Sequence, residues 1–470
     1  MKVLRTFWPS GFLLSAVEAV ILGVLVLFLQ VTPACCDQFE EGLSLLASRH
    51  RGSVGLAFVD IGSKQPLFSY QSRKPLKPAS VMKLLTSSLA LSELGPDFRF
   101  ETEVHTSRLG EEGSIEHLVV RGGGDPNFRT EDMWILARTL FRRGVRKVGT
   151  LHLDTSHFQG LHRRSGQRAY ETGSSALTLN YNSVLFSVCP NPGGKAYVMA
   201  DPWEAGFQVD GAIKTVSGTS KSYSIEDVSS NAGPQKFRVS GRIGSARDCG
   251  EFYRSVRDPV SYFGSTLRGF LEHLGVSVSS IAPHSTGPAG VKKFYTHKSK
   301  ALSQIVEDLN HYSTNVIAEQ ILFYLGGSGG ELRRDKGIDR LRQYAKDLAG
   351  SDPITVVDAS GLSHDNRLTA STVANALVSM HYRVGKGIEF QKSLSVAGRS
   401  GTLKRRLNKS RGMVVRGKTG SLNGVASLAG YLRTEKGSLV AFVIIQNGIS
   451  SPSAAWKFEQ ELLDLVYRGA

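Results

Sequence analysis

A serine and a lysine stand three residues apart in the stretch Pro78-Ala79-Ser80-Val81-Met82-Lys83, just after a proline. The proline and the helical spacing of apolar residues over 81–94 predict a helix that begins near Ser80. Residues i and i+3 lie on one face of a helix, so the Lys83 ammonium can reach the Ser80 hydroxyl. A serine hydroxyl becomes reactive when a base takes its proton, and a lysine held neutral can be that base. Ordinary pairs on helix surfaces share this spacing, so the rest of the chain must decide between the two interpretations.

The remaining pattern predicts an α+β protein of two or three domains, because 470 residues are too many for one ordinary core. Residues 52–70 read as strand, turn and strand, and 412–418, 426–433 and 438–446 as three more strands. Helical periodicity returns from Leu302. Pro452 starts an amphipathic helix, with Trp456, Phe458, Leu462 and Leu465 expected to face inward. We therefore expect an antiparallel sheet covered by helices from both ends of the chain.

The residues between these parts have a different pattern of apolar and polar residues. Residues 101–289 alternate short strand patterns with clusters of Gly, Asn, Asp and Ser, and clear helices are expected only at 130–143 and 259–274. We interpret this block as an inserted strand-rich region of two domains. The Ser80 domain would then comprise residues 37–100 and 290–470.

The N-terminal residues 1–36 predict export from the cytoplasm. Lys2 and Arg5 precede an apolar run over residues 12–31, which is typical of a signal peptide and is also near the length of a membrane span. A cleaved signal, a retained anchor and a lipoprotein box at 32–35 are all open. In each case the body of the protein lies in the periplasm or at the outer face of the cytoplasmic membrane.

The four cysteines fit an exported protein. Cys35 and Cys36 belong to the export segment, which leaves Cys189 and Cys249 as the pair in the body of the chain. An exported compartment permits disulfides, and neither residue has the neighbours of a metal site. We predict a Cys189–Cys249 bridge.

The net charge of +16 is spread along the chain and favours attraction to a polyanion. An anionic wall or membrane surface fits this charge. Nucleic acid is not indicated, because the sequence contains no zinc-finger spacing and no RNP pattern.

Two further motifs lie in the last third of the chain. Ser313-Thr314-Asn315 precedes an apolar helix, and Lys418-Thr419-Gly420 ends an expected strand. Each is weak alone, since Ser-x-Asn is also a common helix cap. Together with Ser80 and Lys83, and in this order, they resemble the motif set of penicillin-binding proteins and class A β-lactamases.

That chemistry gives each residue a role in acyl transfer from a D-alanyl-D-alanine end. Ser80 would be the nucleophile and Lys83 its base, because a second cation, Lys418, disfavours the charged form of Lys83. Ser313 would pass the proton onward, and Asn315 would hydrogen-bond Lys83 and the substrate amide. The terminal carboxylate would be bound by Lys418 and Thr419. The backbone N–H groups of Ser80 and of Ser421, after Gly420, would form the oxyanion hole.

The sequence resembles the class C, low-molecular-mass penicillin-binding proteins, the D-alanyl-D-alanine carboxypeptidase/endopeptidases. Besides the motifs, the resemblance includes residues 78–84, 122–126, 179–182, 315–322, 358–362, 400–403 and 418–428. It implies a penicillin-binding/β-lactamase-like transpeptidase domain with inserted domains. It also implies peptidoglycan stem peptides as substrates and β-lactams as inhibitors, with no metal or organic cofactor.

The resemblance is less complete at the residues that would recognise the substrate. It implies that Asp125, in the Gly-Asp-Pro loop, contacts the amino end of a diamino-acid side chain. Relatives carry Arg after the Gly-Leu-Ser loop, whereas this chain has His364 there. Leu422 and Asn423 are expected at the side wall of the site.

Two other functions compete with the carboxypeptidase. A serine β-lactamase of class A needs a carboxylate that activates a deacylating water, and its E-x-x-L-N loop is not evident here. A non-catalytic wall-binding protein would have no need of the five residues Ser80, Lys83, Ser313, Asn315 and Lys418.

Overall fold

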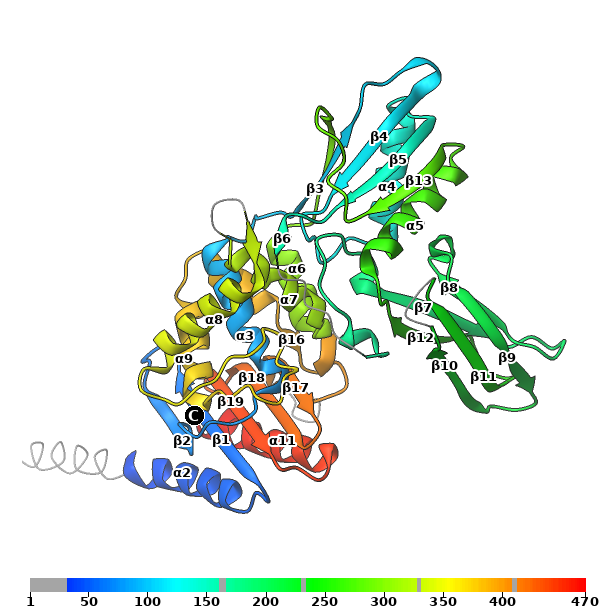
Figure 1. The fold of residues 1–470 in the computed structure, drawn as a ribbon. Helices are drawn as coiled ribbons and strands as arrows, with labels where there is room; N and C mark the ends of the chain where they lie inside the picture. The colour runs from blue at the N-terminus through cyan, green and yellow to red at the C-terminus, as the bar shows by residue number, and fades with distance from the viewer. Residues whose placement is uncertain (1–31, 160–165, 230–233, 328–330, 408–411) are drawn as a thin grey trace, which may run out of the picture.

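The computed structural model describes residues 32–159, 166–229, 234–327, 331–407 and 412–470 (Figure 1). The predicted export segment lies outside this part of the chain up to residue 31, and residues 32–36 open helix α2 (Thr32–Ser48). None of the described helices is both long enough and apolar enough to cross a membrane.

An antiparallel sheet of six strands forms the domain that carries Ser80. Its order is β16-β17-β18-β19-β1-β2, so strands from the two ends of the chain meet where β1 pairs with β19. The strands are β1 (Ser53–Asp60), β2 (Pro66–Tyr70), β16 (Ser395–Val396), β17 (Val414–Leu422), β18 (Val425–Arg433) and β19 (Leu439–Asn447). The predicted antiparallel sheet is confirmed, and the Lys-Thr-Gly motif lies inside β17 instead of at its end.

Alternate residues of these strands pack into two different cores, because side chains on a strand point to opposite faces in turn. On one face, Leu56, Phe58 and Phe442 pack against α2 and α11 (Pro452–Gly469). On the other face, Ala57, Tyr431 and Val443 pack against a group of helices. These are α3 (Met82–Glu93), α6 (Leu302–Tyr312), α7 (Asn315–Leu325), α8 (Arg334–Ala349), α9 (Ala370–His381) and α10 (Lys386–Lys392).

The predicted inward face of the C-terminal helix is partly wrong. Phe458 and Leu462 are buried as expected, but Trp456 and Leu465 are 43% and 38% exposed. The buried stripe of α11 is completed instead by Ala455, Glu459, Leu463 and Val466. At 100° per residue, positions 456 and 465 lie about a quarter turn to either side of this stripe.

The inserted region leaves the Ser80 domain after α3 and is built around three sheets. The first has five strands in the order β13-β5-β4-β3-β14. Its strands are β3 (Glu101–Thr106), β4 (Ser114–Arg121), β5 (Lys147–Asp154), β13 (Ser277–Pro283) and β14 (Lys292–Lys298). Helices α4 (Thr130–Arg142) and α5 (Pro259–His273) contribute to the same core. Because β14 pairs with β3, this sheet extends past the boundary expected at 289–290.

Two three-stranded sheets make up the rest of the inserted region, in the orders β12-β7-β8 and β10-β11-β9. The strands are β7 (Ser183–Cys189), β8 (Tyr197–Asp201), β9 (Gln208–Val216), β10 (Lys221–Asp227), β11 (Lys236–Gly244) and β12 (Gly250–Ser255). Their apolar side chains belong to one cluster with those of the five-stranded sheet. The division into two inserted domains stays a prediction.

The predicted disulfide is confirmed. Cys189, at the end of β7, is bonded to Cys249, which directly precedes β12. The bond links two neighbouring strands of one sheet and closes a loop of 60 residues.

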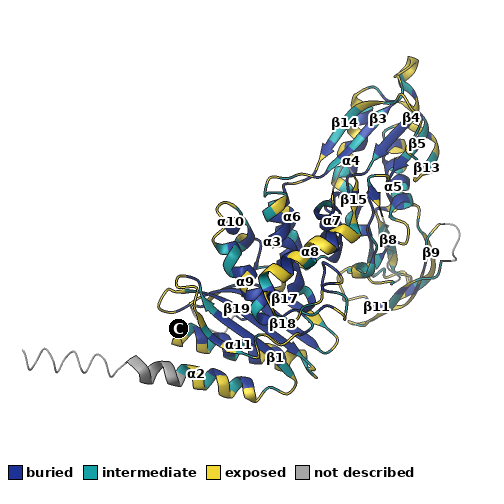
Figure 2. Ribbon diagram, turned by 60° about the vertical axis from the view of Figure 1, so that its left-hand side comes forward, coloured by how far each residue is buried: buried dark blue, intermediate teal, exposed yellow. Residues whose placement is uncertain are grey.

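Helix α7 joins the inserted region to the Ser80 domain. It is buried along most of its length, as is α3, whereas α8 exposes one face to solvent (Figure 2). The Gln320 side chain is fully buried and its Nε2 donates to the Ser175 carbonyl oxygen (2.6 Å) and to Thr178 Oγ1 (3.1 Å). The helix that begins at Asn315 therefore also binds two residues of the inserted region.

Candidate active site

Ser80 lies in a tight turn directly before α3. The turn is a 3-10 helix over Ala79–Val81, and Ala79 has a φ of 48°, a left-handed conformation that costs energy for a residue with a side chain. Two glycines accommodate this turn. A Cβ on Gly361 would lie 1.8 Å from the Ala79 carbonyl oxygen, and one on Gly420 would lie 2.9 Å from the Ser80 nitrogen. The backbone at Gly361 and the backbone at Gly420 therefore both pack closely against the turn that contains Ser80.

Lys83 is fully buried and its Nζ has three oxygen neighbours. It lies 3.0 Å from Ser80 Oγ, 2.7 Å from Asn315 Oδ1 and 2.5 Å from the Ser360 carbonyl oxygen. The amide and carbonyl oxygens can only accept hydrogen bonds, so they occupy two N–H groups of Lys83. The remaining named contact of Lys83 Nζ is the Ser80 hydroxyl, and a neutral lysine would direct its lone pair toward that hydroxyl.

The orientation of the Asn315 amide is fixed by the inserted region. Its Nδ2 donates to the Tyr170 carbonyl oxygen at 3.1 Å, which requires Oδ1 to face Lys83. Tyr170 belongs to a short 3-10 helix, Ala169–Glu171. A residue of the inserted region thus contacts the Ser-x-Asn motif directly.

Ser313 connects this group to Lys418. It ends α6 in the left-handed region, with a φ of 60°, and so separates α6 from α7. The fully buried Lys418 donates from Nζ to Ser313 Oγ and to the Thr419 carbonyl oxygen, both at 2.8 Å. Burial, and secondly the nearby charge of Lys83, hold the pKa of the Lys418 ammonium well below its ordinary value of 10.5.

Strand β17 borders the Ser80 turn with the other residues predicted at this site. Thr419 donates from Oγ1 to Thr402 Oγ1 at 2.8 Å, and Ser421 is exposed. Leu422 is half-buried and ends the strand, and the exposed Asn423 forms the turn to β18 with Gly424, which has a φ of 71°. Ser427 on β18 donates to the Pro78 carbonyl oxygen at 2.7 Å, which ties the sheet to the Ser80 turn.

The loop after α8 carries both Ser360 and His364. The Asp358 carboxylate accepts hydrogen bonds from the backbone N–H groups of Gly361 (2.6 Å) and Ser363 (2.8 Å), which hold the loop in shape. From the other side, buried Glu319 on α7 accepts from the Ser360 N–H at 3.2 Å. His364 is exposed, and its carbonyl oxygen accepts from Arg367 at 2.6 Å.

Asp125 is buried in the Gly-Asp-Pro loop. The residue is 4% exposed, and its carboxylate accepts a hydrogen bond from the Asn127 N–H at 2.9 Å. Gln320 packs against the preceding residue, Gly124, and five residues of helix place Gln320 about 7.5 Å along α7 from Asn315. Burial raises the pKa of Asp125 from 3.8 to about 7. The contact of Asp125 with substrate stays a prediction.

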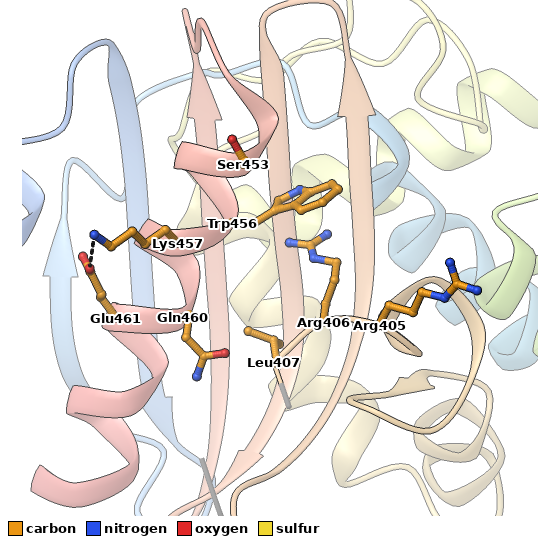
Figure 3. A pocket seen from close by; sticks show the side chains of 8 residues that line it. All are labelled: Arg405, Arg406, Leu407, Ser453, Trp456, Lys457, Gln460 and Glu461. Carbon is orange, nitrogen blue, oxygen red and sulfur yellow. Dashed lines mark ion pairs between the residues drawn. The ribbon is translucent and has the colours of Figure 1, made fainter. Parts of the chain in front are cut away.

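A separate pocket of about 420 Å³ lies between residues 405–407 and α11. The Arg406 guanidinium lies over the Trp456 ring there, 4.6 Å from the ring centre (Figure 3). Arg406 also pairs with buried Glu459. None of the site residues predicted from the motifs lines this pocket. Among the described residues, no cluster of His, Cys, Asp and Glu could hold a metal ion.

Comparison with known proteins identifies the family. Residues 44–466 match the D-Ala-D-Ala carboxypeptidase 3 (S13) family. The chain belongs to this family. It is 30% identical to the D-alanyl-D-alanine carboxypeptidase of Actinomadura sp. (strain R39), over 85% of this chain and 78% of that protein. Identity to the carboxypeptidase DacB of Haemophilus influenzae is 24%, over 88% of this chain and 91% of the relative.

The fold of this S13 family member matches solved structures. Penicillin binding protein 4 (dacB) from Haemophilus influenzae superposes with a TM-score of 0.76 at 22% identity, covering 91% of this chain and 99% of that one. A predatory endopeptidase from Bdellovibrio bacteriovorus, Bd0816, gives a TM-score of 0.51 at 16% identity, covering 88% and 93%. The predicted family and the predicted penicillin-binding-protein fold are both confirmed.

Proposed function

We propose that this S13 carboxypeptidase cleaves D-alanyl-D-alanine ends through an acyl-enzyme on Ser80. Ser80 Oγ would attack the carbonyl carbon of the penultimate D-alanine, with its proton passing to Lys83. The C–N bond then breaks, and the leaving D-alanine takes up a proton through Ser313. Water hydrolyses the ester and restores Ser80. If the leaving amine belongs to a second stem peptide, the same steps make an endopeptidase.

One observation carries this proposal: the contacts of Lys83 Nζ. Two of its three oxygen neighbours, Asn315 Oδ1 and the Ser360 carbonyl oxygen, cannot donate a hydrogen bond, and the third is the Ser80 hydroxyl at 3.0 Å. A neutral Lys83 that donates to these two oxygens can direct its lone pair at Ser80 Oγ. Lys418 favours this state, since two buried cations disfavour each other's charged forms. A positioned base of this kind accelerates proton transfer about 10²–10⁴-fold.

The contacts of β17 support the proposed binding of the substrate. Lys418 and Thr419 would hold the terminal carboxylate, with Lys418 charged when that carboxylate is bound. The close approach of Gly420 to the Ser80 nitrogen supports an oxyanion hole built from the N–H groups of Ser80 and Ser421. Such a donor supplies about 2.7–4 kcal/mol to the transition state.

The residues around this group would recognise the rest of the substrate. Leu422 and Asn423, at the end of β17, would form one wall. His364 stands on the loop whose Ser360 contacts Lys83, so it could meet a second arm of the substrate. Asp125 would reach such an arm only after its loop had moved, because its carboxylate is buried.

The proposed substrates are the stem peptides of peptidoglycan, which the protein would bind outside the cytoplasm. β-Lactams would be inhibitors. The relatives support this choice. One solved structure of the Haemophilus influenzae protein is a complex with a β-lactam, and a Dictyostelium discoideum relative, 25% identical, is named penicillin-sensitive carboxypeptidase A. The periplasm, or the outer face of the cytoplasmic membrane, is the proposed location.

Labelling with a fluorescent penicillin, with Ser80→Ala as the control, tests the proposed function. The wild type should form a covalent adduct and release D-alanine from a peptide that ends in D-alanyl-D-alanine, and Ser80→Ala should do neither. Absence of both reactions in the wild type would favour a non-catalytic wall-binding protein. Fast, multiple turnover of nitrocefin in place of a long-lived adduct would favour a β-lactamase.

A further inference from the structure

The segment 382–388, which comprises the turn after α9 and the first residues of α10, exposes apolar side chains to the solvent. Val384 is 97% exposed, the largest fraction among the large apolar side chains of the described chain, and Ile388 is 71% exposed. Tyr382 is 46% exposed. Monomeric proteins expose single apolar residues routinely, but three within seven residues of one turn point to a contact surface. We call residues 382–388 the Val384 turn.

The fold keeps these side chains exposed. The Gly387 N–H donates to the Arg383 carbonyl oxygen at 2.7 Å and closes a tight turn around Gly385, which has a φ of 72°. A Cβ on Gly387 would lie 2.3 Å from the Met380 carbonyl oxygen, so the turn is pressed against the end of α9. Lys386 Nζ donates to the Ser92 carbonyl oxygen at 2.8 Å and fastens the turn to the end of α3.

Basic side chains surround the Val384 turn. Lys64, in the β1–β2 turn, places its Nζ 4.2 Å from the centre of the Tyr382 ring. Arg383 and Lys392 are exposed on the same segment. Two nearby carboxylates are paired, Glu389 with this same Lys392 at 3.8 Å and Glu93 with Arg340, which leaves Lys64 and Arg383 as the cations offered to a partner.

We propose that the Val384 turn docks this protein on the surface of an anionic lipid bilayer. Branched aliphatic side chains beside an aromatic ring and lysines are the combination that enters the headgroup region, where the apolar groups leave water and the cations meet lipid phosphates. A hydrated polyanion, such as a wall polymer, would use the cations but would leave Val384 and Ile388 in water. The exposed aliphatic groups therefore favour the bilayer.

Docking at this turn would orient the active site. Helix α3 has 12 residues and is about 18 Å long, with Ser80 just before its first turn and Ser92, the residue bound by Lys386, in its last. A bilayer at the Ser92 end leaves the Ser80 end facing away from the lipid. This orientation rests on the proposed function, whereas the docking does not.

A fluorophore at position 384 tests the docking in the full-length chain. The environment-sensitive dye NBD is attached to Val384→Cys in a Cys35→Ser, Cys36→Ser background, with Val414→Cys, 50% exposed on β17, as the matched control. With vesicles of phosphatidylglycerol and phosphatidylcholine, the dye at 384 should shift to the blue and the dye at 414 should not. The shift should fade at high salt and with pure phosphatidylcholine. Arg383→Gln should lower the apparent affinity of this response about five-fold, the effect of about 1 kcal/mol.

Several results would overturn the proposal. These are no shift at 384 with anionic vesicles, an equal shift at 414, or a shift produced by soluble polyphosphate and not by vesicles. A concentration-dependent dimer that Val384→Asp abolishes would assign the turn to a second copy of the chain instead. Penicillin labelling of the same samples keeps the two questions separate, because a fall in labelling concerns the active site and not the turn.

Discussion

The position of Lys83 beside two carbonyl-type oxygens and one hydroxyl supports the proposed role of this buried lysine as a base. Burial favours the neutral form of an amine, and burial together with the charge of Lys83 holds the pKa of the neighbouring Lys418 well below 10.5. The geometry then decides where the amine accepts its proton. Asn315 is central to that geometry because its amide contacts Lys83 through one end and Tyr170 through the other.

Asn315→Asp should slow acylation of Ser80 by penicillin about 100-fold at neutral pH, within the range of a lost general base. One carboxylate oxygen would face the Tyr170 carbonyl oxygen and be repelled by it. The other would stabilise the charged form of Lys83, so the rate should recover as the pH is raised. Stopped-flow acylation rates from pH 6 to pH 10 measure this. Asn315→Ala is the control, since it should be slow with an unshifted pH profile. An unchanged rate in Asn315→Asp at neutral pH would contradict the role given to the amide.

At the residue scale, the sequence allowed prediction of which side chains the fold brings together around Ser80. Ser80, Lys83, Ser313, Asn315 and Lys418 come together as the motifs predict. The carbonyl oxygens of Ser360 and Tyr170 were missed because any residue has a carbonyl group, and no motif records where it points. The burial of Asp125 was not predictable either, because it depends on how α7 packs against the inserted region, which the motif does not encode.

Among the elements, strand β17 and the Ser80 turn depend most closely on each other. Gly420 allows their approach, because a side chain there would meet Ser427 Oγ at 2.2 Å and the Ser80 nitrogen at 2.9 Å. Gly417 on the same strand is less crowded, with a nearest contact of 3.1 Å to the Ala429 carbonyl oxygen. The two glycines provide a matched pair.

Gly420→Ala should lower the rate of penicillin acylation about 10²–10³-fold, the effect of losing one oxyanion donor. The methyl group would push β17 away from the Ser80 turn and misplace the Ser421 N–H. Gly417→Ala should change the rate far less. Acylation rates and thermal unfolding midpoints of both variants should be compared. Equal acylation by the two variants, with both folded, would contradict the proposed oxyanion hole.

The elements themselves were largely predictable from periodicity. Strands β1, β2, β17, β18 and β19 of the main sheet and helices α4 and α5 lie within a few residues of their expected bounds. The inward face of α11 was not fully predictable. Its stripe includes Glu459, which is buried against Arg406, and a charged residue gives no apolar signal in a sequence.

On the scale of the whole molecule, the inserted region has its own core and its own disulfide, and it reaches the active site through Tyr170. The short strand patterns separated by clusters of Gly, Asn, Asp and Ser predicted a strand-rich region between Ser80 and Ser313. The end of this region was not predictable, because the pairing of β14 with β3 joins residues almost 200 positions apart.

Removal of the disulfide should destabilise the inserted region and leave acylation intact. A bridge that closes 60 residues contributes about 2–4 kcal/mol, mainly by restricting the unfolded chain. The Cys189→Ser, Cys249→Ser variant should therefore unfold at lower temperature and still label with penicillin below that transition. Labelling that is lost while the variant stays folded would show that the bridge also shapes the catalytic group.

Asp125 should make stability depend on pH. Its native pKa of about 7 exceeds the ordinary value of 3.8, so the native state holds a proton that the unfolded state releases. The stabilising contribution is fully present below pH 3.8 and is lost as the pH rises through 7, at up to about 1.4 kcal/mol per unit. Asp125→Asn keeps the acceptor for the Asn127 N–H and should reduce this dependence. Denaturant unfolding between pH 4 and pH 8 would measure it, and parallel curves for the wild type and the variant would refute it.

The most direct test of the account is to locate the covalent adduct by mass spectrometry. After brief exposure to benzylpenicillin, the protein should carry one penicilloyl group, and peptide sequencing should find it on Ser80. Lys83→Ala should carry almost none in the same time although it is folded. An adduct on another residue, or full acylation of Lys83→Ala at the wild-type rate, would contradict the assignment of Ser80 as nucleophile and Lys83 as its base.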